Sequence, residues 1–193
     1  MLIRSFIALY PDPAAREEMA RFVSCLRQKE RGVRWEQTDK IHVTMKFLGD
    51  MEPKTLDAIA AGLAAGIPAL PLSQKGIPGR IDRTGGFPNL RRPRIVWLGF
   101  STPPPAVLAL QQLVEEVCMG EGVEPEEKAF TPHFTIGRVR RDADTDGLEN
   151  ALQACSFQPS PVRFTRLCIM ESTLTPQGAI HKERIHFSLT PGE

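Results

Sequence analysis

The sequence lacks long apolar runs and has almost no net charge. Its most apolar stretch, residues 56–72, is interrupted by a carboxylate, glycines and prolines, so it is too short and too polar to cross a bilayer. The first ten residues lack the extended apolar core of a signal peptide. The net charge of +1 excludes a protein-wide field that attracts nucleic acid, so any affinity for phosphate must be local. We therefore expect a globular protein without membrane contact.

Paired cysteines are missing as well. The four cysteines form no Cys-x-x-Cys motif and lie far apart in the sequence: Cys25, Cys118, Cys155 and Cys168. This spacing argues against a zinc site or a disulfide framework and favours partly buried free thiols in a reducing cytosol. The sequence thus predicts a cytoplasmic protein.

A repeat with a period of 91 residues organises the chain. Shifting the sequence by this distance, without a gap, superimposes Phe6 on Trp97, His42 on His133, and Thr44 on Thr135. Each copy runs strand, helix, strand. Ordinary α/β alternation is the alternative explanation, but it does not account for two amphipathic helices with the same phase and the same distance to the next motif. We therefore interpret the two halves as a duplicated unit.

The first helices of the two copies share one pattern. After a strand over residues 3–9, Asp12 is placed to cap a helix that has Pro13 in its first turn. The corresponding strand of the second copy covers residues 95–100, and residues 102–104 form its cap region. Apolar residues then recur at helical spacing. They are Met19, Phe22, Val23 and Leu26 in the first copy and Leu110, Leu113, Val114 and Val117 in the second.

Each half continues beyond its motif with a further helix and with strands. The helices are marked by Leu56, Ile59 and Leu63 and by Leu148, Ala151 and Leu152. Strands are predicted over residues 72–81, 162–172 and 180–189, with a turn at 176–178 between the last two. Residues 76–94 are predicted to form a loop rich in glycine, proline and arginine.

These elements predict an α+β protein with one domain over residues 1–193. The domain is a bilobal duplicated unit with pseudo-symmetric lobes at about 1–92 and 93–193. Each lobe has a small, mainly antiparallel sheet with helices on the outside, and a central cleft lies between the lobes. Since the fused repeat already supplies a twofold within one chain, we expect a monomer.

The two His-x-Thr motifs lie on predicted strands. Alternation along residues 41–47 directs side chains to two faces. Ile41, Val43, Met45 and Phe47 face the core, and His42, Thr44 and Lys46 face the other way. The second motif repeats the pattern, with Phe134 and Ile136 inward and His133 and Thr135 outward. If a pseudo-twofold relates the halves, the two polar faces meet across the cleft.

Two imidazoles and two hydroxyls around one pocket suit a displacement at phosphorus. A neutral histidine can remove a proton from the nucleophile while a protonated one supplies a proton to the leaving oxygen. An unperturbed pKa of about 6.5 makes both forms accessible near neutral pH. Threonine hydroxyls can donate to the phosphoryl oxygens, and no metal is required. One such tripeptide is weak evidence, because a strand histidine more often only bonds a neighbour. The repeat register is what joins the two motifs.

Residues 42–50, with the sequence HVTMKFLGD, and residues 132–138, with the sequence PHFTIGR, resemble the signature motifs of the 2H phosphoesterases. Within that superfamily the chain is most similar to the RNA 2′,3′-cyclic phosphodiesterases, historically called 2′-5′ RNA ligases. Similar segments occur at 4–9, 86–88 and 93–97. The resemblance covers essentially the whole chain.

The resemblance implies a bilobal fold, no metal or other cofactor, and hydrolysis of RNA or nucleotide 2′,3′-cyclic phosphates to 2′-phosphates. RNA ends and nucleotides of this kind are then the partners. By position, His42 and His133 are the catalytic pair, and Thr44, Thr135 and Arg138 hold the phosphate. We assign His133 as the general base that activates water and His42 as the general acid toward the departing O3′.

Three residues near the motifs have open interpretations. Strict alternation from His133 turns Arg138 toward the core, unless a bulge at Gly137 redirects it or the strand ends there. Phe47 is either a core residue, which burial habit favours, or a base-stacking platform. His181 occupies a position where the family often has a tyrosine, which makes it a candidate for a base or ribose contact. A third catalytic histidine is not required.

Five arginines gather in the predicted loop: Arg80, Arg83, Arg91, Arg92 and Arg94. They either guide an RNA backbone electrostatically or lie on a solvated surface.

Two other functions remain open. A 2′-5′ RNA ligase would use the same residues in reverse, although water at high concentration favours hydrolysis. A non-catalytic RNA- or nucleotide-binding module would keep the groove without turnover, but a pure binder would not need two titratable groups.

Overall fold

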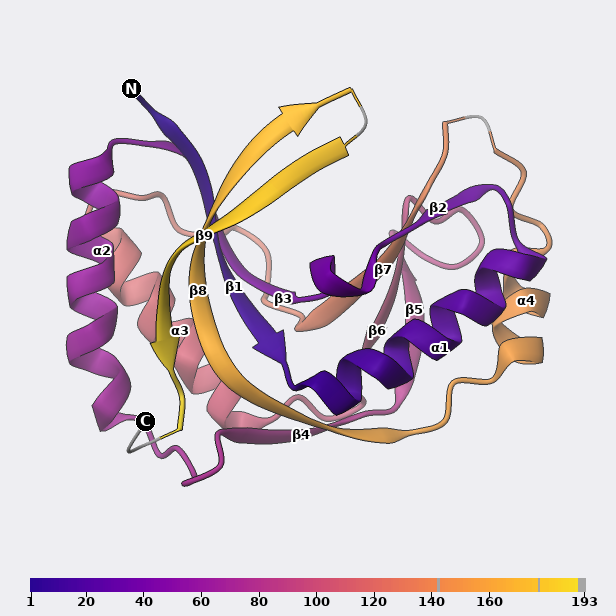
Figure 1. Ribbon diagram of the computed structural model, residues 1–193, viewed down its shortest axis with the longest axis horizontal. Helices are drawn as coiled ribbons and strands as arrows, with labels where there is room; N and C mark the ends of the chain where they lie inside the picture. Colours follow the sequence, from indigo (N-terminus) through magenta and orange to yellow (C-terminus); the bar gives the residue numbers. More distant parts are fainter. Residues whose placement is uncertain (142, 177, 191–193) are drawn as a thin grey trace.

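The computed structural model describes residues 1–141, 143–176 and 178–190, and within them the chain forms four α-helices and nine strands (Figure 1). The elements are β1 (Ile3–Pro11), α1 (Pro13–Lys29), β2 (Val33–Trp35), β3 (Val43–Met51), α2 (Pro53–Gly66), β4 (Ile77–Ile81), β5 (Arg83–Phe87), β6 (Ile95–Gly99), α3 (Pro105–Gly120), β7 (His133–Val139), α4 (Leu148–Cys155), β8 (Ser160–Thr175) and β9 (Gly178–Ser188). Short 3-10 helices lie at Thr38–Lys40 and Ile67–Ala69. Gln177, within the predicted turn at 176–178, lies outside the described residues.

The strands form one antiparallel sheet in the order β4-β8-β1-β3-β7-β6-β5. Strand β2 also pairs with β7, and β9 pairs with β8. A single pair of Cα partners, Val43 and Phe134, links β3 to β7. The α+β class, the antiparallel strands and the outer helices are therefore confirmed. The two small sheets that we expected are joined at this one point into a continuous sheet.

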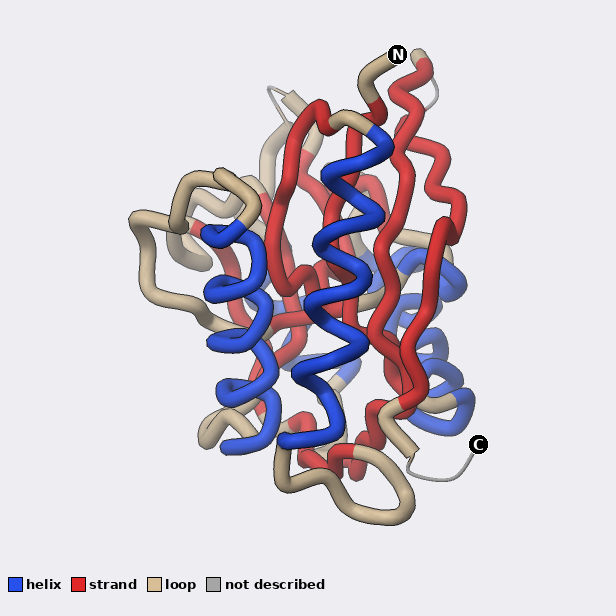
Figure 2. The backbone as a smooth tube through the Cα atoms, turned by 90° about the vertical axis from the view of Figure 1, so that its left-hand side faces the viewer, coloured by secondary structure: helices blue, strands red, loops and turns tan. Residues whose placement is uncertain are grey.

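The two halves of the chain exchange elements. Strand β2 comes from the first half but pairs with β7, and β8 and β9 come from the second half, with β8 paired to β1. The helices also pair across the halves, α2 with α3 and α1 with α4. Figure 2 shows helices standing against the strands of the sheet. Each structural lobe thus draws on both repeats, while the division at about residue 92 stays a prediction about the sequence.

The helix signals in the sequence account for the helices observed. Asp12 caps α1, because its Oδ1 accepts a hydrogen bond from the backbone N–H of Ala15 at 3.0 Å, and Pro13 is the first helical residue. Leu113 and Val117 of α3 are half-buried and lie against α2. There, Gly62 and Gly66 of α2 leave the room that a larger residue would fill. None of the helices in the described ranges is long and apolar enough to span a membrane.

The loop predicted over residues 76–94 is confirmed for residues 88–94 but wrong for residues 77–87, of which 77–81 fall within the strand predicted over 72–81. This segment contains β4, which pairs with β8, and β5, which pairs with β6. Its glycines mark close approach rather than irregular structure, because a Cβ at Gly85 would collide with the ring of Trp97. The arginines of the segment are accordingly dispersed. Arg83 lies over the Trp97 ring at 5.9 Å from its centroid, and Arg94 lines a cavity described below.

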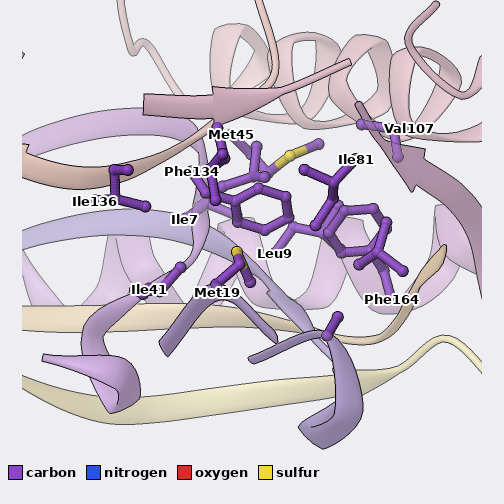
Figure 3. Packing of buried hydrophobic residues seen from close by; sticks show 14 of the residues in the cluster. Ile7, Leu9, Met19, Ile41, Met45, Ile81, Val107, Phe134, Ile136 and Phe164 are labelled. Atoms are coloured by element: carbon purple, nitrogen blue, oxygen red, sulfur yellow. The ribbon is translucent and has the colours of Figure 1, made fainter. Parts of the chain in front are cut away.

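The core lies between the sheet and its helices. Figure 3 shows side chains of β1, β3, β7, β8 and α1 meeting there, with Phe134 and Phe164 stacked at a centroid distance of 5.9 Å. One charged side chain is part of this interior. Lys46 is 2% exposed and bonds Glu115 of α3 at 2.7 Å and the carbonyl of Glu124 at 2.9 Å. A lysine can be buried in this way because a carboxylate and a carbonyl take the place of its hydration shell.

The prediction of four free thiols is also wrong. Cys25, near the end of α1, and Cys155, at the end of α4, form a disulfide with a Cα–Cα distance of 5.9 Å. Their separation of 130 residues hides the pairing from any local motif. Cys118 and Cys168 are free and buried, as expected. Because stable disulfides are uncommon in a reducing cytosol, the cytoplasmic location stays a prediction that this bond does not support.

We expect reduction of the disulfide to destabilise the fold without abolishing it. Closing a 130-residue loop removes conformational entropy from the unfolded chain, so Cys25→Ala should lower the free energy of unfolding by about 2–4 kcal/mol. Urea denaturation with and without reductant measures this. Cys25→Ala/Cys155→Ala should match the single variant and be insensitive to reductant. An unchanged midpoint of the wild-type protein in reductant would contradict the bond.

Candidate active site

The two His-x-Thr motifs lie on either side of the β3–β7 junction. His42 directly precedes β3, and His133 is the first residue of β7. An aromatic ring of the neighbouring strand lies beside each imidazole. Phe6 of β1 stacks on His42 at 5.2 Å, and Trp97 of β6 lies 6.3 Å from His133, measured between ring centroids. Since Phe6 and Trp97 are also 91 residues apart, the repeat seen in the sequence is a repeat of local packing.

Both imidazoles are oriented by the same backbone contact. Nδ1 of His42 donates to the carbonyl of Lys40 at 2.7 Å, and Nδ1 of His133 donates to the carbonyl of Thr131 at 2.7 Å. With Nδ1 as the donor, Nε2 of a neutral ring carries the lone pair. In His42 this nitrogen accepts a hydrogen bond from the Thr44 hydroxyl at 3.2 Å.

A β-bulge changes the phase of each motif strand. In the β1–β3 pairing the register skips Met45, and in the β6–β7 pairing it skips Ile136, which is 91 residues later. Both residues are buried, and Figure 3 shows both in the core. A bulge adds one residue to one strand, so the residues that follow it face the opposite way from strict alternation.

Because of the bulge in β3, the side chains of Lys46 and Phe47 point in the opposite directions from those we predicted. Lys46 does not share the polar face of His42 but points into the core. Phe47, which we expected in the core, is 65% exposed and lines the groove. Arg138 is likewise directed to the groove, as the alternative with a bulge predicted, although the extra residue is Ile136 rather than Gly137.

Two cavities flank the junction and share three lining residues, Thr44, Phe47 and Arg138. The first, of about 690 Å³, contains His133 and Thr135 and has three phenylalanines in its wall: Phe47, Phe87 and Phe130. We call it the phenylalanine chamber. The second, of about 820 Å³, contains His42 and four basic side chains: Arg4, Arg34, Lys40 and Arg138. We call it the arginine chamber. The two histidines thus face one divided groove.

Arg138 lies where the chambers meet. Its Nε lies 3.4 Å from Oε1 of Glu36, and its side chain is 49% exposed, so the guanidinium keeps donors available to a ligand. His181 lies in the arginine chamber, with its ring 6.2 Å from that of His42 and 4.8 Å from that of Phe6. Its buried Nδ1 has no partner within the described residues. The structure therefore brings Arg138, Phe47 and His181 to the predicted site.

Several groove residues were missed in the sequence. Arg34 lies on a strand of three residues, and Phe130 lies in the loop before β7, so neither is marked by a periodic pattern. The carbonyl acceptors at Lys40 and Thr131 carried a usable signal, because each lies two residues before a motif histidine and they are 91 residues apart. Glu36 had no such signal. In the described part of the chain, no group of three or more His, Cys, Asp or Glu residues is arranged to hold a metal ion.

Burial controls the charge of the imidazoles of both motifs. Desolvation lowers the pKa of His42 from 6.5 to about 4, with further lowering by His181, Arg138 and His133 and a partial offset from the Lys40 carbonyl. Desolvation, with a smaller effect from Arg138, also lowers the pKa of His133. Both rings are therefore neutral near pH 7 in the free protein. A phosphate anion in the groove would act in the opposite direction and favour the protonated form.

We expect NMR titration to show a low pKa for His42 in the free protein and a higher one with inorganic phosphate bound. The unfolded chain binds a proton at this position near pH 6.5, whereas the folded chain does so only near about pH 4. Stability from this group is therefore complete above pH 6.5 and is lost as the pH falls toward 4. Urea titrations at several pH values check this sign. A His42 signal that titrates near 6.5 without phosphate would contradict the buried, neutral ring.

Comparison with known proteins agrees with this architecture. A curated protein named RNA 2′,3′-cyclic phosphodiesterase from Thermotoga maritima is 30% identical over 93% of this chain and 92% of its own length. Another of that name, from Methanothermobacter thermautotrophicus, is 26% identical over 98% and 100%. Among solved structures, LigT of Escherichia coli complexed with 3′-AMP has a TM-score of 0.74 at 19% identity, covering 98% of this chain and 99% of its own. TT0787 of Thermus thermophilus also has a TM-score of 0.74, at 21% identity, and covers 99% and 100%.

The chain therefore has the fold of LigT and TT0787. The profile of the 2′-5′ RNA ligase superfamily matches residues 10–175. The chain belongs to this superfamily, which confirms the resemblance found in its motifs.

Proposed function

We propose that this protein hydrolyses RNA or nucleotide 2′,3′-cyclic phosphates to 2′-phosphates by two-histidine acid/base catalysis. One observation carries the proposal. Two imidazoles from equivalent positions of the repeat have Nδ1 on a backbone carbonyl and Nε2 available toward one groove. The predicted enzyme class, a hydrolase of RNA 2′,3′-cyclic phosphates, agrees with the names of the curated relatives.

In this mechanism the phosphate lies between the histidines, at the meeting point of the chambers. Nε2 of neutral His133 removes a proton from water as the water oxygen bonds to phosphorus. The P–O3′ bond breaks, and Nε2 of protonated His42 gives its proton to O3′, which leaves a 2′-phosphate and a free 3′-hydroxyl. Thr44 and Thr135 donate to the non-bridging oxygens, and Arg138 adds a charge-assisted contact.

The repeat makes the two histidines equivalent in the sequence, and the burial of His42 supports the assignment of His42 as the acid and His133 as the base. A ring whose pKa is lowered to about 4 is a strong acid once it is protonated, and the negative phosphate beside it favours that protonated form. His133 stays neutral and has its lone pair on Nε2, as a general base requires.

The two alternative functions use the same groove. Ligation of RNA ends through a 2′-5′ bond reverses the chemistry, with a 5′-hydroxyl in place of water. A non-catalytic binding module would explain the basic and aromatic walls but not two neutral imidazoles of matched tautomer. Hydrolysis accounts for both, so we favour it.

We expect His42→Ala and His133→Ala each to reduce kcat for adenosine 2′,3′-cyclic phosphate by about 10²–10⁴-fold, because each removes one proton transfer. Activity should persist in EDTA, and chromatography should identify adenosine 2′-phosphate as the product. His186→Ala is the matched control, since that histidine is exposed on β9 and bonds Glu183. Full activity in either motif variant, dependence on a metal, or a 3′-phosphate product would each overturn a part of the mechanism.

The two roles can be separated with a substrate whose leaving group needs no acid. Adenosine 2′-(4-nitrophenyl phosphate) releases nitrophenolate instead of O3′, so loss of the general acid should matter little. His42→Ala should then retain most wild-type activity toward this diester, while His133→Ala should remain strongly impaired. Release of nitrophenolate, followed by its absorbance, measures both. If His133→Ala instead retained most activity toward this diester and His42→Ala lost it, His133 would be the general acid and His42 the general base.

A further inference from the structure

The arginine chamber has more positive charge than one cyclic phosphate requires. Its described lining includes three arginines and Lys40, and Glu36 is the single acidic residue among them. Arg138 is already assigned to the reacting phosphate and touches Glu36. Arg4 and Arg34 have no such assignment, and both are exposed to the chamber.

Arg34 and Arg138 are direct cross-strand partners in the β2–β7 pairing. Like charges opposite each other on an antiparallel pair destabilise it, unless an anion lies between or beside them. Arg34 forms no ion pair with any described residue, since Glu36 is engaged by Arg138. The charge of the Arg34 guanidinium is therefore not neutralised by the described part of the protein, and Arg34 lies next to Arg138, which is assigned to the reacting phosphate.

The β8–β9 hairpin forms the opposite wall of the arginine chamber, near Arg34. Nζ of Lys40 donates to the carbonyl of Ala179 at 3.2 Å, which fastens the start of β9 to the segment before His42. A Cβ on Gly178 would lie 3.6 Å from Nη1 of Arg34, so the arginine lies close to the hairpin. This enclosure makes the guanidinium part of a walled cavity, where a salt-bridged anion is less screened than on an open surface.

Both chambers have basic side chains, since Arg94 and Lys128 line the phenylalanine chamber, but only the arginine chamber has two arginines that face each other on paired strands, Arg34 and Arg138. In a terminal nucleotide the cyclic phosphate spans O2′ and O3′, the base leaves the ribose at C1′, and the RNA chain leaves at C4′ through O5′. The phenylalanine chamber offers rings on which a base can stack. The arginine chamber offers planar donors that bind a phosphate in bidentate fashion.

We propose that Arg34 binds the phosphate on O5′ of the terminal nucleotide, so that the preferred substrate is an RNA end or a 5′-phosphorylated nucleotide rather than a nucleoside 2′,3′-cyclic phosphate. The proposal rests on the proposed function. It places the cyclic phosphate at the junction, the terminal base in the phenylalanine chamber and the preceding phosphate in the arginine chamber.

The test compares kcat/KM for three substrates: adenosine 2′,3′-cyclic phosphate, its 5′-phosphorylated form, and a diadenylate ending in the cyclic phosphate. The wild-type protein should prefer the two that carry a phosphate on O5′ by about tenfold or more, the size of one charge-assisted contact. Arg34→Gln should reduce that preference to about twofold or less. Arg31→Gln removes the same charge three residues away, lines neither chamber, and should keep the preference.

The outcomes separate this inference from the proposed function. Absence of turnover with all three substrates would refute the proposed hydrolase. Turnover without any preference for a phosphate on O5′, or an equal loss on all three substrates in Arg34→Gln, would overturn the assignment of Arg34 alone. If Arg34→Gln instead impairs only the joining of an added 5′-hydroxyl oligonucleotide, the chamber receives a second strand and the assignment is also overturned.

Discussion

The groove depends on one pair of backbone partners, Val43 on β3 and Phe134 on β7. Both side chains are completely buried, so neither strand can slip by one residue without turning an apolar side chain outward and an imidazole into the core. The residues next to them along each strand are the motif residues, His42 with Thr44 and His133 with Thr135. A contact inside the hydrophobic core therefore fixes how far apart the two polar faces lie, and every group in the groove is positioned from that contact.

The paired bulges turn a symmetric frame into an asymmetric site. Each bulge follows its motif at the same place in the repeat, so each strand sends the second residue beyond the bulge into the groove. In one strand that residue is Phe47, and in the other it is Arg138. Between the bulge and this groove residue lies Lys46 on β3, which reaches into the core to Glu115. The equivalent residue on β7 is Gly137, and its lack of a side chain leaves room for Val33 and Trp35 of β2. Duplication thus supplied matching backbones, and different side chains gave the two walls different chemistry.

Much of this arrangement was predictable because it repeats or alternates. The 91-residue register identified both histidines and both threonines, and helical periodicity identified the buried face of α1 and two residues of the buried face of α3, Leu110 and Val114. The predictions that were wrong concern features that arise from contacts distant in the sequence or from irregularities in the strands. The bulges at Met45 and Ile136 reversed the expected faces of Lys46 and Phe47, the glycines of β5 reflected a close approach to Trp97, and the disulfide joins helices 130 residues apart. Arg34 was missed because its strand has only three residues and its importance comes from its partner on β7.

The Nδ1 acceptors of both histidines are main-chain carbonyls rather than carboxylates. Many catalytic imidazoles depend on an acidic side chain for this task, and a single substitution there selects the wrong tautomer. Here the tautomer is encoded in the path of the chain two residues before each ring, and no side-chain replacement removes the acceptor. The surrounding walls are therefore free to diverge in evolution, so that one backbone frame can hold the two imidazoles in the same tautomer beside grooves of different size and charge.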